Sequence, residues 1–314
     1  SAGTASCLGL LPSKSDILPT AAYFILGGKC RFNCIFCTRR QDNTNSLDNR
    51  LSRVNWPEFD LSMIGQKLAE GKHSLQRICL QVVQENNIFH QMMRVINELR
   101  SYTDLPMCVS FLPEKKEDFQ LILQSGVDRV CAGLDAASFR VACNNNKPHW
   151  RRNLTIIKET AGKFPGCVTV HLIVGLGETE EEMIGLINQM VQNGVTIALF
   201  ALTPLKGTAA ANQLPPPMKK YRHIQASYYL LKEKILTMDD FVFTDGQLKC
   251  INKPVGQWLD ILADGKAFMT SGCPGCNRPY YNERPGREPY NYPRPLTPEE
   301  IKRCLSELSD IIKE

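Results

Sequence analysis

Between residues 20 and 235, short apolar runs rich in β-branched residues alternate with longer amphipathic segments. The apolar runs are typical of buried strands, and the amphipathic segments are typical of helices. Repeated strand–helix units favour a parallel sheet with helices outside it. The predicted strands are 21–27, 76–83, 106–111, 128–133, 167–175 and 196–202, and the predicted helices are 86–101, 115–125, 150–163, 179–193 and 218–235. Six such units predict an α/β fold, a partial (β/α)6 barrel of the TIM type.

The composition divides the chain into three parts. We expect an N-terminal segment over 1–19, the barrel over 20–235, and a C-terminal cysteine-containing appendage over 236–314. The appendage opens with a hairpin-like stretch at 241–248 and continues through a segment rich in Pro, Gly and Tyr. Its last part, 297–313, is predicted to be one amphipathic helix that starts near Pro298.

Charge and hydropathy exclude several classes of protein. A hydrophobic content of 43% and a charged content of 22% are those of a globular protein, not of a disordered or fibrous one. The net charge is +5, and the basic residues do not form a run in the sequence, which weighs against nucleic-acid binding. We find no apolar run long enough to span a bilayer and no signal-peptide pattern, so we expect a cytoplasmic protein with no membrane partner.

Thirteen cysteines cannot form a fully paired disulfide framework, because the number is odd. Metal or redox chemistry explains them better. Four of them stand singly in apolar or helical patterns, where cysteine commonly acts as a small buried hydrophobe. These are Cys131, Cys143, Cys167 and Cys304.

Cys30, Cys34 and Cys37 follow the first predicted strand with the spacing C-x3-C-x2-C. Three thiolates in one short loop can hold three irons of a [4Fe–4S] cluster and leave the fourth iron open to a cofactor. Loops at the carboxyl ends of barrel strands build the active site, so this loop is well placed. A zinc site completed by a distant fourth ligand is the alternative.

This spacing, with Phe36 just before the third cysteine, resembles the radical S-adenosylmethionine superfamily. The resemblance implies that S-adenosyl-L-methionine chelates the open iron. Reduction of the cluster then cleaves the cofactor to a 5′-deoxyadenosyl radical, which abstracts hydrogen from an unactivated carbon.

Residues 20–215 are similar to biotin synthase and its relatives, on the runs VCAGLDAAS (130–138), VHLIVGLGETE (170–180) and ALTPLKGT (201–208). The resemblance implies that Asp135 contacts the ribose and that Arg152 contacts the methionine carboxylate. Either residue is otherwise an ordinary solvated charge at a helix end. The full set of cofactor contacts that the resemblance implies is Phe36, Gln81, Asp135, Arg152, Gly175, Glu178, Leu199 and Ala201.

Cys273 and Cys276 form a C-x2-C pair in a Gly- and Pro-rich turn, whose amide groups can bond to cluster sulfurs. The pair predicts a second, auxiliary [4Fe–4S] cluster, although zinc or a redox dithiol would also suit it. Sequence leaves the other ligands open among Cys250, Cys7, Ser271 and Arg278, with Cys250 as the provisional choice. Cys79 and Cys108 resemble sulfur-donor ligands of biotin synthase, but Thr169 stands in place of the third, so both are predicted to be core thiols.

The run CPGCNRPYYNERPG (273–286), beside such a barrel, resembles the two-component lipoyl synthases. That resemblance implies sulfur insertion into an octanoyl-lysyl group of a lipoyl carrier protein, with a related radical enzyme and a reductant protein as partners. Another enzyme of the biotin synthase group, such as a mutase or a metallocofactor maturase, is the main alternative. A noncatalytic iron–sulfur partner protein is a third.

Overall fold

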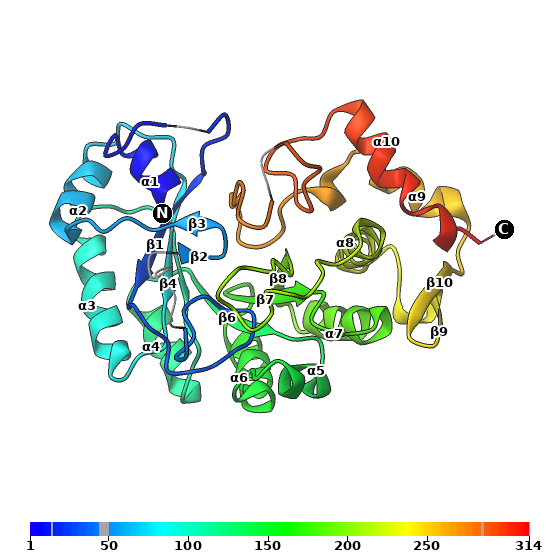
Figure 1. Cartoon of the computed structure of the whole chain (residues 1–314), viewed down its shortest axis with the longest axis horizontal. Helices are drawn as coiled ribbons and strands as arrows, with labels where there is room; N and C mark the ends of the chain where they lie inside the picture. Colours follow the sequence, from blue (N-terminus) through cyan, green and yellow to red (C-terminus); the bar gives the residue numbers. More distant parts are fainter. Residues whose placement is uncertain (14, 44–49, 284–285, 314) are drawn as a thin grey trace.

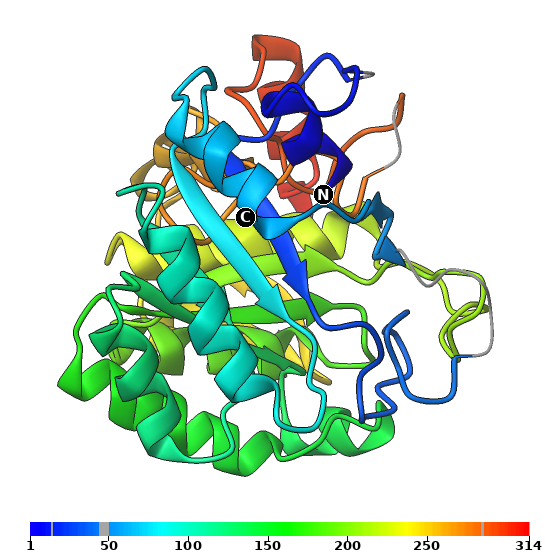
Figure 2. The same ribbon diagram turned by 90° about the vertical axis from the view of Figure 1, so that its left-hand side faces the viewer.

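The computed structural model describes residues 1–13, 15–43, 50–283 and 286–313. Its centre is a six-stranded parallel sheet in the order β1-β4-β5-β6-β7-β8 (Figures 1 and 2). The strands are β1 Ala21–Leu26, β4 Arg77–Val82, β5 Met107–Ser110, β6 Arg129–Asp135, β7 Val168–Val174 and β8 Thr196–Ala201. All six lie within a residue or two of the predicted ranges. The predicted α/β partial barrel is therefore confirmed.

Helices cover the outer face of this sheet, as Figures 1 and 2 show. They are α2 Leu61–Ala69, α3 Ile88–Arg100, α4 Lys116–Gln124, α5 Phe139–Asn144, α6 Trp150–Lys163, α7 Glu180–Gln192 and α8 Met218–Lys232. In α3, Ile88, Met92 and Ile96 recur at every fourth position and are buried, so one apolar stripe faces the strands. At the start of α7, Thr179 and Glu182 form a capping box that fixes where the helix begins.

Alternation along each strand separates an outer face from an inner one. On β6, Val130, Ala132 and Leu134 are buried in the main hydrophobic core, whereas Cys131 and Gly133 line a central cavity. This parity gives every strand a row of residues that faces the inside of the barrel.

The sheet is open, because β1 and β8 are its two edges and do not pair with each other. Residues 271–283, which we call the closing segment, cover the free edge of β8. The Leu199 amide donates to Ser271 Oγ at 2.9 Å, and the Asn282 side chain donates to the Ala201 carbonyl at 3.0 Å. Gly272 has φ +129°, and a Cβ there would lie 3.0 Å from that of Ala198. Only glycine allows the segment this close to β8.

The same segment also binds the opposite edge of the sheet. The Thr20 amide donates to Asn277 Oδ1 at 3.0 Å, and the Arg278 amide donates to the Tyr23 hydroxyl at 3.1 Å. The closing segment therefore spans the gap between β1 and β8. In Figure 1 it is the orange stretch that curves back toward the strands.

The rest of the chain packs around this core. The remaining elements are α1 Ala2–Cys7, the hairpin of β2 Arg50–Leu51 with β3 Val54–Asn55, the hairpin of β9 Phe241–Thr244 with β10 Gln247–Ile251, α9 Leu259–Leu262 and α10 Pro298–Ser306. The prediction of one helix over 297–313 is wrong, because α10 ends at Ser306 and Ile312 bridges Ile251 in an extended conformation. No helix among the described residues is long and apolar enough to cross a membrane.

A buried histidine ties the C-terminus to the barrel helices. Nδ1 of His223, on α8, lies 2.8 Å from Glu180 at the start of α7, and its Nε2 lies 3.2 Å from Asp310. Burial opposes the charge on His223, but Glu180 and Asp310 together raise its pKa above the usual 6.5. The protonated imidazole is thus the form that the folded protein prefers.

We predict that this triad makes stability fall as pH rises. The folded-state pKa is raised, so the stabilisation is complete below the unfolded pKa of about 6.5 and is lost as pH rises through the folded value. Thermal unfolding followed by circular dichroism from pH 6 to 8.5 should show a falling midpoint in the native protein and a flatter profile in His223→Gln. The control is His73→Gln, whose histidine has no carboxylate partner among the described residues. Equal slopes in all three proteins would contradict the prediction.

Candidate active site

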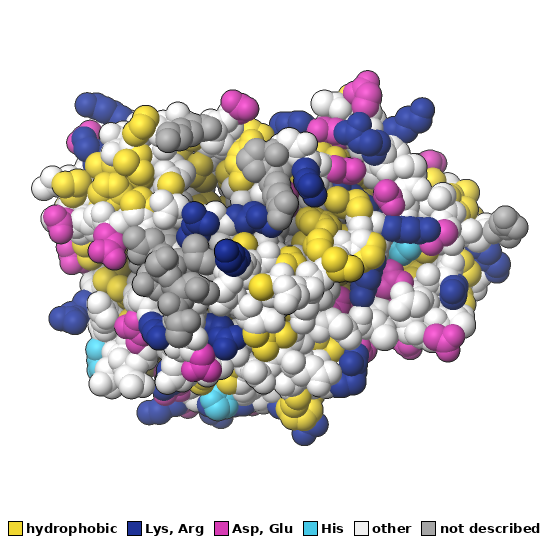
Figure 3. All heavy atoms as spheres, viewed as in Figure 1, with side chains coloured by type: hydrophobic (Ala, Val, Ile, Leu, Met, Phe, Trp, Pro, Cys, Tyr) yellow, Lys and Arg dark blue, Asp and Glu magenta, His cyan; other side chains and the backbone are white. Residues whose placement is uncertain are grey.

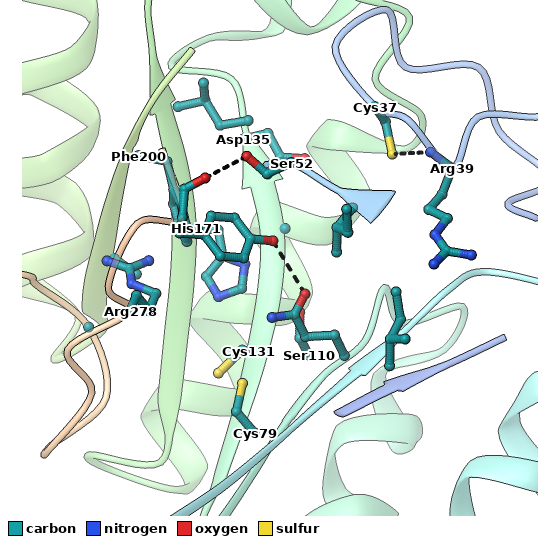
Figure 4. A pocket seen from close by; sticks show the side chains of 18 of the residues that line it. Cys37, Arg39, Ser52, Cys79, Ser110, Cys131, Asp135, His171, Phe200 and Arg278 are labelled. Carbon is teal, nitrogen blue, oxygen red and sulfur yellow. Dashed lines mark hydrogen bonds between the residues drawn. The ribbon is translucent and has the colours of Figure 1, made fainter. Parts of the chain in front are cut away.

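The barrel encloses a cavity of about 290 Å³ between the inner faces of the strands, the loop after β1 and the closing segment. Eight of the thirteen cysteines line it. They are Cys30, Cys34, Cys37, Cys79, Cys108, Cys131, Cys273 and Cys276. Figure 4 labels three of them, with Cys37 at one end of the cavity and Cys79 and Cys131 at the other. We call the first end the mouth and the second end the floor.

The mouth is built by residues 27–43, which leave β1 at its carboxyl end. Gly27 has φ +89° and lies so close to Val83 that a Cβ would stand 3.1 Å away. The Glu85 carboxylate then accepts the amide protons of Gly28 and Lys29. The Cys30 amide closes the loop by donating to the Arg39 carbonyl at 2.7 Å. These bonds turn the loop so that Cys30, Cys34 and Cys37 all line the cavity.

Positive charge accompanies the thiols at the mouth. Burial raises the pKa of Cys34 to about 11, against the opposing effect of Lys147, and raises the pKa of Cys37 to about 12. Lys147 forms a 2.5 Å ion pair with Asp135, and both side chains are largely buried. Although burial disfavours the ammonium, Asp135 raises the pKa of Lys147, which stays charged. Buried thiols next to a fixed cation suit a metal centre, since a bound metal deprotonates thiols outright.

A second group of thiols forms the floor. The Sγ atoms of Cys108 on β5, Cys131 on β6 and Cys273 in the closing segment all lie within 4.8 Å of one another. Cys131 and Cys273 are 3.7 Å apart. Hydrogen bonds to Cys108 and Cys273, together with burial, raise the pKa of Cys131 well above its usual range. Three convergent thiols from three different segments form a candidate metal site.

Two more thiols stand beside this group. Cys79 on β4 is in register with Cys108 on β5. The Cys276 thiol and the Tyr23 hydroxyl form a hydrogen bond at 3.1 Å, in which either group can donate, and the same hydroxyl accepts the Arg278 amide proton. The floor therefore offers five cysteines, more than the four that a tetrahedral site or a cubane cluster needs.

A layer of uncharged side chains separates the two thiol groups (Figure 4). It contains Ser110, Gly133, His171 and Phe200. Burial, assisted by Arg278, lowers the pKa of His171 to about 4, so the imidazole is neutral. His171 contacts the Phe200 ring edge-on at 5.2 Å. The four residues of this layer carry no charge, but the Arg278 guanidinium lines the same cavity and lies over the Phe200 ring at 4.0 Å.

The structure brings some predicted cofactor residues to the cavity and not others. Phe36, Gln81, Asp135 and Ala201 line it. Arg152, Gly175, Glu178 and Leu199 are not among the lining residues. Arg152 is exposed and donates to the Pro113 carbonyl, and Glu178 is buried and accepts the Gly175 amide proton at 2.7 Å. The Leu199 side chain is buried, while its backbone binds the closing segment.

The structure corrects several sequence-based predictions about cysteines. Cys250 lies on β10, where it pairs with Val242, and the structure does not bring it to Cys273. Cys79 and Cys108 were expected to be core thiols and Cys131 a small buried hydrophobe; Cys108 and Cys131 are indeed buried, but all three line the cavity. The alternation of side chains along a strand could have predicted the position of Cys131. Asp135 was expected to face the cofactor, and Cys131 lies four residues before it on the same strand, so both side chains face the same side of the sheet.

Cys7, another provisional ligand, lies on α1 with its thiol 3.6 Å from the Pro19 carbonyl and does not line the cavity. Ser271 and Arg278 do line it. The prediction that Cys143 is a small buried hydrophobe is wrong, because its side chain is exposed; Cys304 is buried as predicted, and neither residue lines the cavity.

Comparison with known families agrees with the geometry of the mouth. The family described as the radical SAM superfamily matches residues 24–190, which is more than half of the chain and includes the three cysteines of the mouth. The chain belongs to the radical SAM superfamily. Membership of this superfamily implies a [4Fe–4S] cluster and S-adenosyl-L-methionine as cofactors. The thiols of Cys30, Cys34 and Cys37 are suited to hold the cluster.

Two characterised relatives narrow the group. The chain is 26% identical to a biotin synthase of Persephonella marina over 185 residues, which are 58% of this chain and 53% of the relative. It is 22% identical to a lipoyl synthase of Bacillus subtilis over 214 residues, which are 67% of this chain and 66% of the relative. The chain thus spans about half to two thirds of the length of these curated relatives. It is a radical SAM enzyme that is similar to members of the biotin synthase and lipoyl synthase group.

Solved structures show the same barrel. The FeFe-hydrogenase maturase HydG from Carboxydothermus hydrogenoformans matches with a TM-score of 0.54 at 15% identity, over 68% of this chain and 51% of that one. Methylornithine synthase (PylB) matches with a TM-score of 0.52 at 12% identity, over 68% of this chain and 62% of that one. These similarities establish the fold of the radical SAM domain.

We predict that replacing Cys30, Cys34 and Cys37 together by Ala abolishes formation of 5′-deoxyadenosine from S-adenosylmethionine. The change removes all three thiolates at the mouth and leaves the floor intact, so metal bound at the floor should remain. Chromatography of the reduced reaction mixture measures the nucleoside, and Cys143→Ala at an exposed thiol is the control. Undiminished cleavage by the triple variant would contradict the assignment.

Proposed function

We propose that the protein is a radical SAM sulfur-insertion enzyme, a lipoyl synthase component that acts on an octanoyl-lysyl group of a lipoyl carrier protein. A related radical SAM enzyme and a reductant protein would act beside it. The observation that carries the proposal is the second thiol group, Cys108, Cys131 and Cys273, within 4.8 Å of one another at the floor of the cavity whose mouth holds the three family cysteines.

The floor suits an auxiliary [4Fe–4S] cluster by its donor set and its charges. Three convergent thiols are present, and Cys276 is positioned by Tyr23 to be the fourth. Arg278 lines the cavity beside them, and its positive charge opposes the effect of burial on the pKa of Cys276; Arg77 also lines the cavity but pairs with Asp128 at 2.9 Å. Guanidinium groups offset the negative charge of a thiolate-ligated cluster, since charge and hydrogen bonding around such clusters set their properties.

The cavity between the two sites suits an alkyl chain. When bound, the two clusters and the cofactor supply a hydrogen-abstracting radical at one end and sulfur at the other. Residues of the protein would exclude water and hold the alkyl substrate. The apolar side chains that line the cavity are those of Phe32, Phe36, Phe111, Leu112 and Leu205. The layer of Ser110, Gly133, His171 and Phe200 carries no charge, and the neighbouring Arg278 guanidinium is a permanent cation that cannot act as a base on a carbon. A C–H bond of a saturated chain has no leaving group, so radical abstraction fits this environment.

The relatives support the same chemistry. A biotin synthase and a lipoyl synthase are among the curated proteins to which this chain is similar. The closing segment adds what the barrel alone lacks, because it delivers Cys273 and Cys276 to the inside of the barrel. A cluster held at this floor would lie across the cavity from the radical and could serve as the sulfur source.

We predict that changing Cys108, Cys131 and Cys273 to Ala separates radical formation from sulfur transfer. Anaerobically reconstituted native protein should carry about eight iron atoms and the triple variant about four, since one cubane cluster contains four. The variant should still form 5′-deoxyadenosine and should transfer no sulfur to an octanoylated carrier peptide, as measured by product mass. Cys250→Ala is the matched control and should keep all three properties. One zinc and four irons in the native protein, with iron unchanged in the variant, would contradict the sulfur-insertion proposal.

We also predict that Asp135→Ala weakens binding of S-adenosylmethionine. Asp135 lines the mouth, and loss of a charged acceptor for a ribose hydroxyl costs roughly 1.5–3 kcal/mol, or about 10- to 150-fold in affinity. Equilibrium titration measures the affinity, and the absorbance of the cluster should be retained. Because Lys147 loses its partner in this variant, Lys147→Met is the comparison. Unchanged affinity in Asp135→Ala would refute the ribose contact.

A further inference from the structure

The positive charge of the chain is concentrated in one short stretch. Residues 27–53 contain six basic and two acidic side chains, a net charge of +4, whereas the whole chain has +5. The basic residues are Lys29, Arg31, Arg39, Arg40, Arg50 and Arg53. Apart from the adjacent Arg39 and Arg40, they are separated by other residues, so they do not form a basic run.

This stretch borders the mouth of the cavity. Arg39, Leu51 and Ser52 line the cavity itself, and the neighbouring side chains surround them. Lys206 adds to the rim, because it follows Leu205, which also lines the cavity. In Figure 3, which views the molecule as in Figure 1, Lys and Arg side chains gather around the centre of this face. We call these seven basic residues the basic rim.

Carboxylates neutralise only part of the basic rim. Glu114 pairs with Arg31, and Asp42 lies 3.8 Å from Arg40. Lys29, Arg50 and Lys206 are exposed and form no ion pair with any residue that the structure describes. The electrostatic surplus is therefore at the surface, where an approaching molecule meets it.

We propose that the basic rim docks an acidic protein surface, that of the carrier domain which presents the acylated lysine. This inference rests on the proposed function, because a substrate fixed to a carrier lysine enters the cavity only if its carrier sits against the mouth. Complementary charge speeds such encounters and sets orientation more than it adds affinity per pair. It is also screened beyond about 8 Å at physiological ionic strength, so docking is salt-sensitive. The basic rim thus selects the carrier domain, while the apolar cavity selects the octanoyl group that the carrier bears.

The test compares two charge-reversal variants on two substrates. Arg50→Glu with Lys206→Glu reverses two rim charges at side chains that do not line the cavity. Lys249→Glu with Lys302→Glu makes the same charge change at exposed positions on β10 and α10, away from the mouth (Figure 1). The substrates are an octanoylated carrier domain of net negative charge and a short uncharged octanoyl-lysyl peptide. Dithionite supplies the electrons, so that no reductant protein takes part.

We expect the rim variant to raise KM for the carrier domain about tenfold at low salt, with kcat and all peptide kinetics unchanged. The distal variant should match the native protein, and added salt should remove the difference. Titration calorimetry with the octanoylated carrier domain should show the same loss of affinity without any turnover. An equal KM and affinity for the carrier in both variants would overturn the inference, as would a loss that also appears with the peptide.

Two other outcomes distinguish a failure of carrier docking from a failure of the proposed function. A defect that appears only when a reductant protein replaces dithionite would assign the basic rim to the electron donor and overturn carrier docking. If the native protein cleaves S-adenosylmethionine but transfers sulfur to neither substrate, the proposed function fails. Salt-sensitive binding of the carrier domain would even then support the basic rim as its docking surface.

Discussion

The open edges of the six-stranded sheet are the constraint on which the site depends. A barrel of six strands leaves β1 and β8 unpaired, and edge backbone groups must find partners. Here side chains of the closing segment supply them, with Ser271 and Asn282 binding β8 and Asn277 binding the residue before β1. The closing segment therefore both covers the edges of the sheet and brings Cys273 to the inside of the barrel.

Strand parity gives the cavity its order from mouth to floor. Neighbouring strands place residues of equal height side by side, so Cys131 is in register with Thr169, and Gly133 with His171. The hydroxyl oxygen of Thr169 in turn lies 3.6 Å from the Sγ atom of Cys273. The floor, the neutral middle layer and the mouth are thus successive levels of one barrel. A radical formed at the mouth and a sulfur source at the floor would face the same substrate atoms across the middle layer.

Local patterns in the sequence predicted what depends on local physics. The six strands, the main helices and the cysteines of the mouth all follow from periodicity or from spacing within one loop. Only part of the floor could be predicted in this way, because the C-x2-C spacing singled out Cys273, whereas Cys108 and Cys131 lie 165 and 142 residues before it. Cys250 is only 23 residues from Cys273, yet the β9–β10 hairpin holds it elsewhere. Proximity in sequence was a poor guide to which thiols converge.

The central claim is that two separate iron–sulfur sites face each other across one cavity. Anomalous diffraction at the iron absorption edge, from anaerobic crystals of reconstituted protein, tests it most directly. The account predicts two iron peaks, one beside Cys30, Cys34 and Cys37 and one beside Cys108, Cys131 and Cys273. A single iron peak at the mouth, with the floor thiols free or bound to zinc, would contradict it.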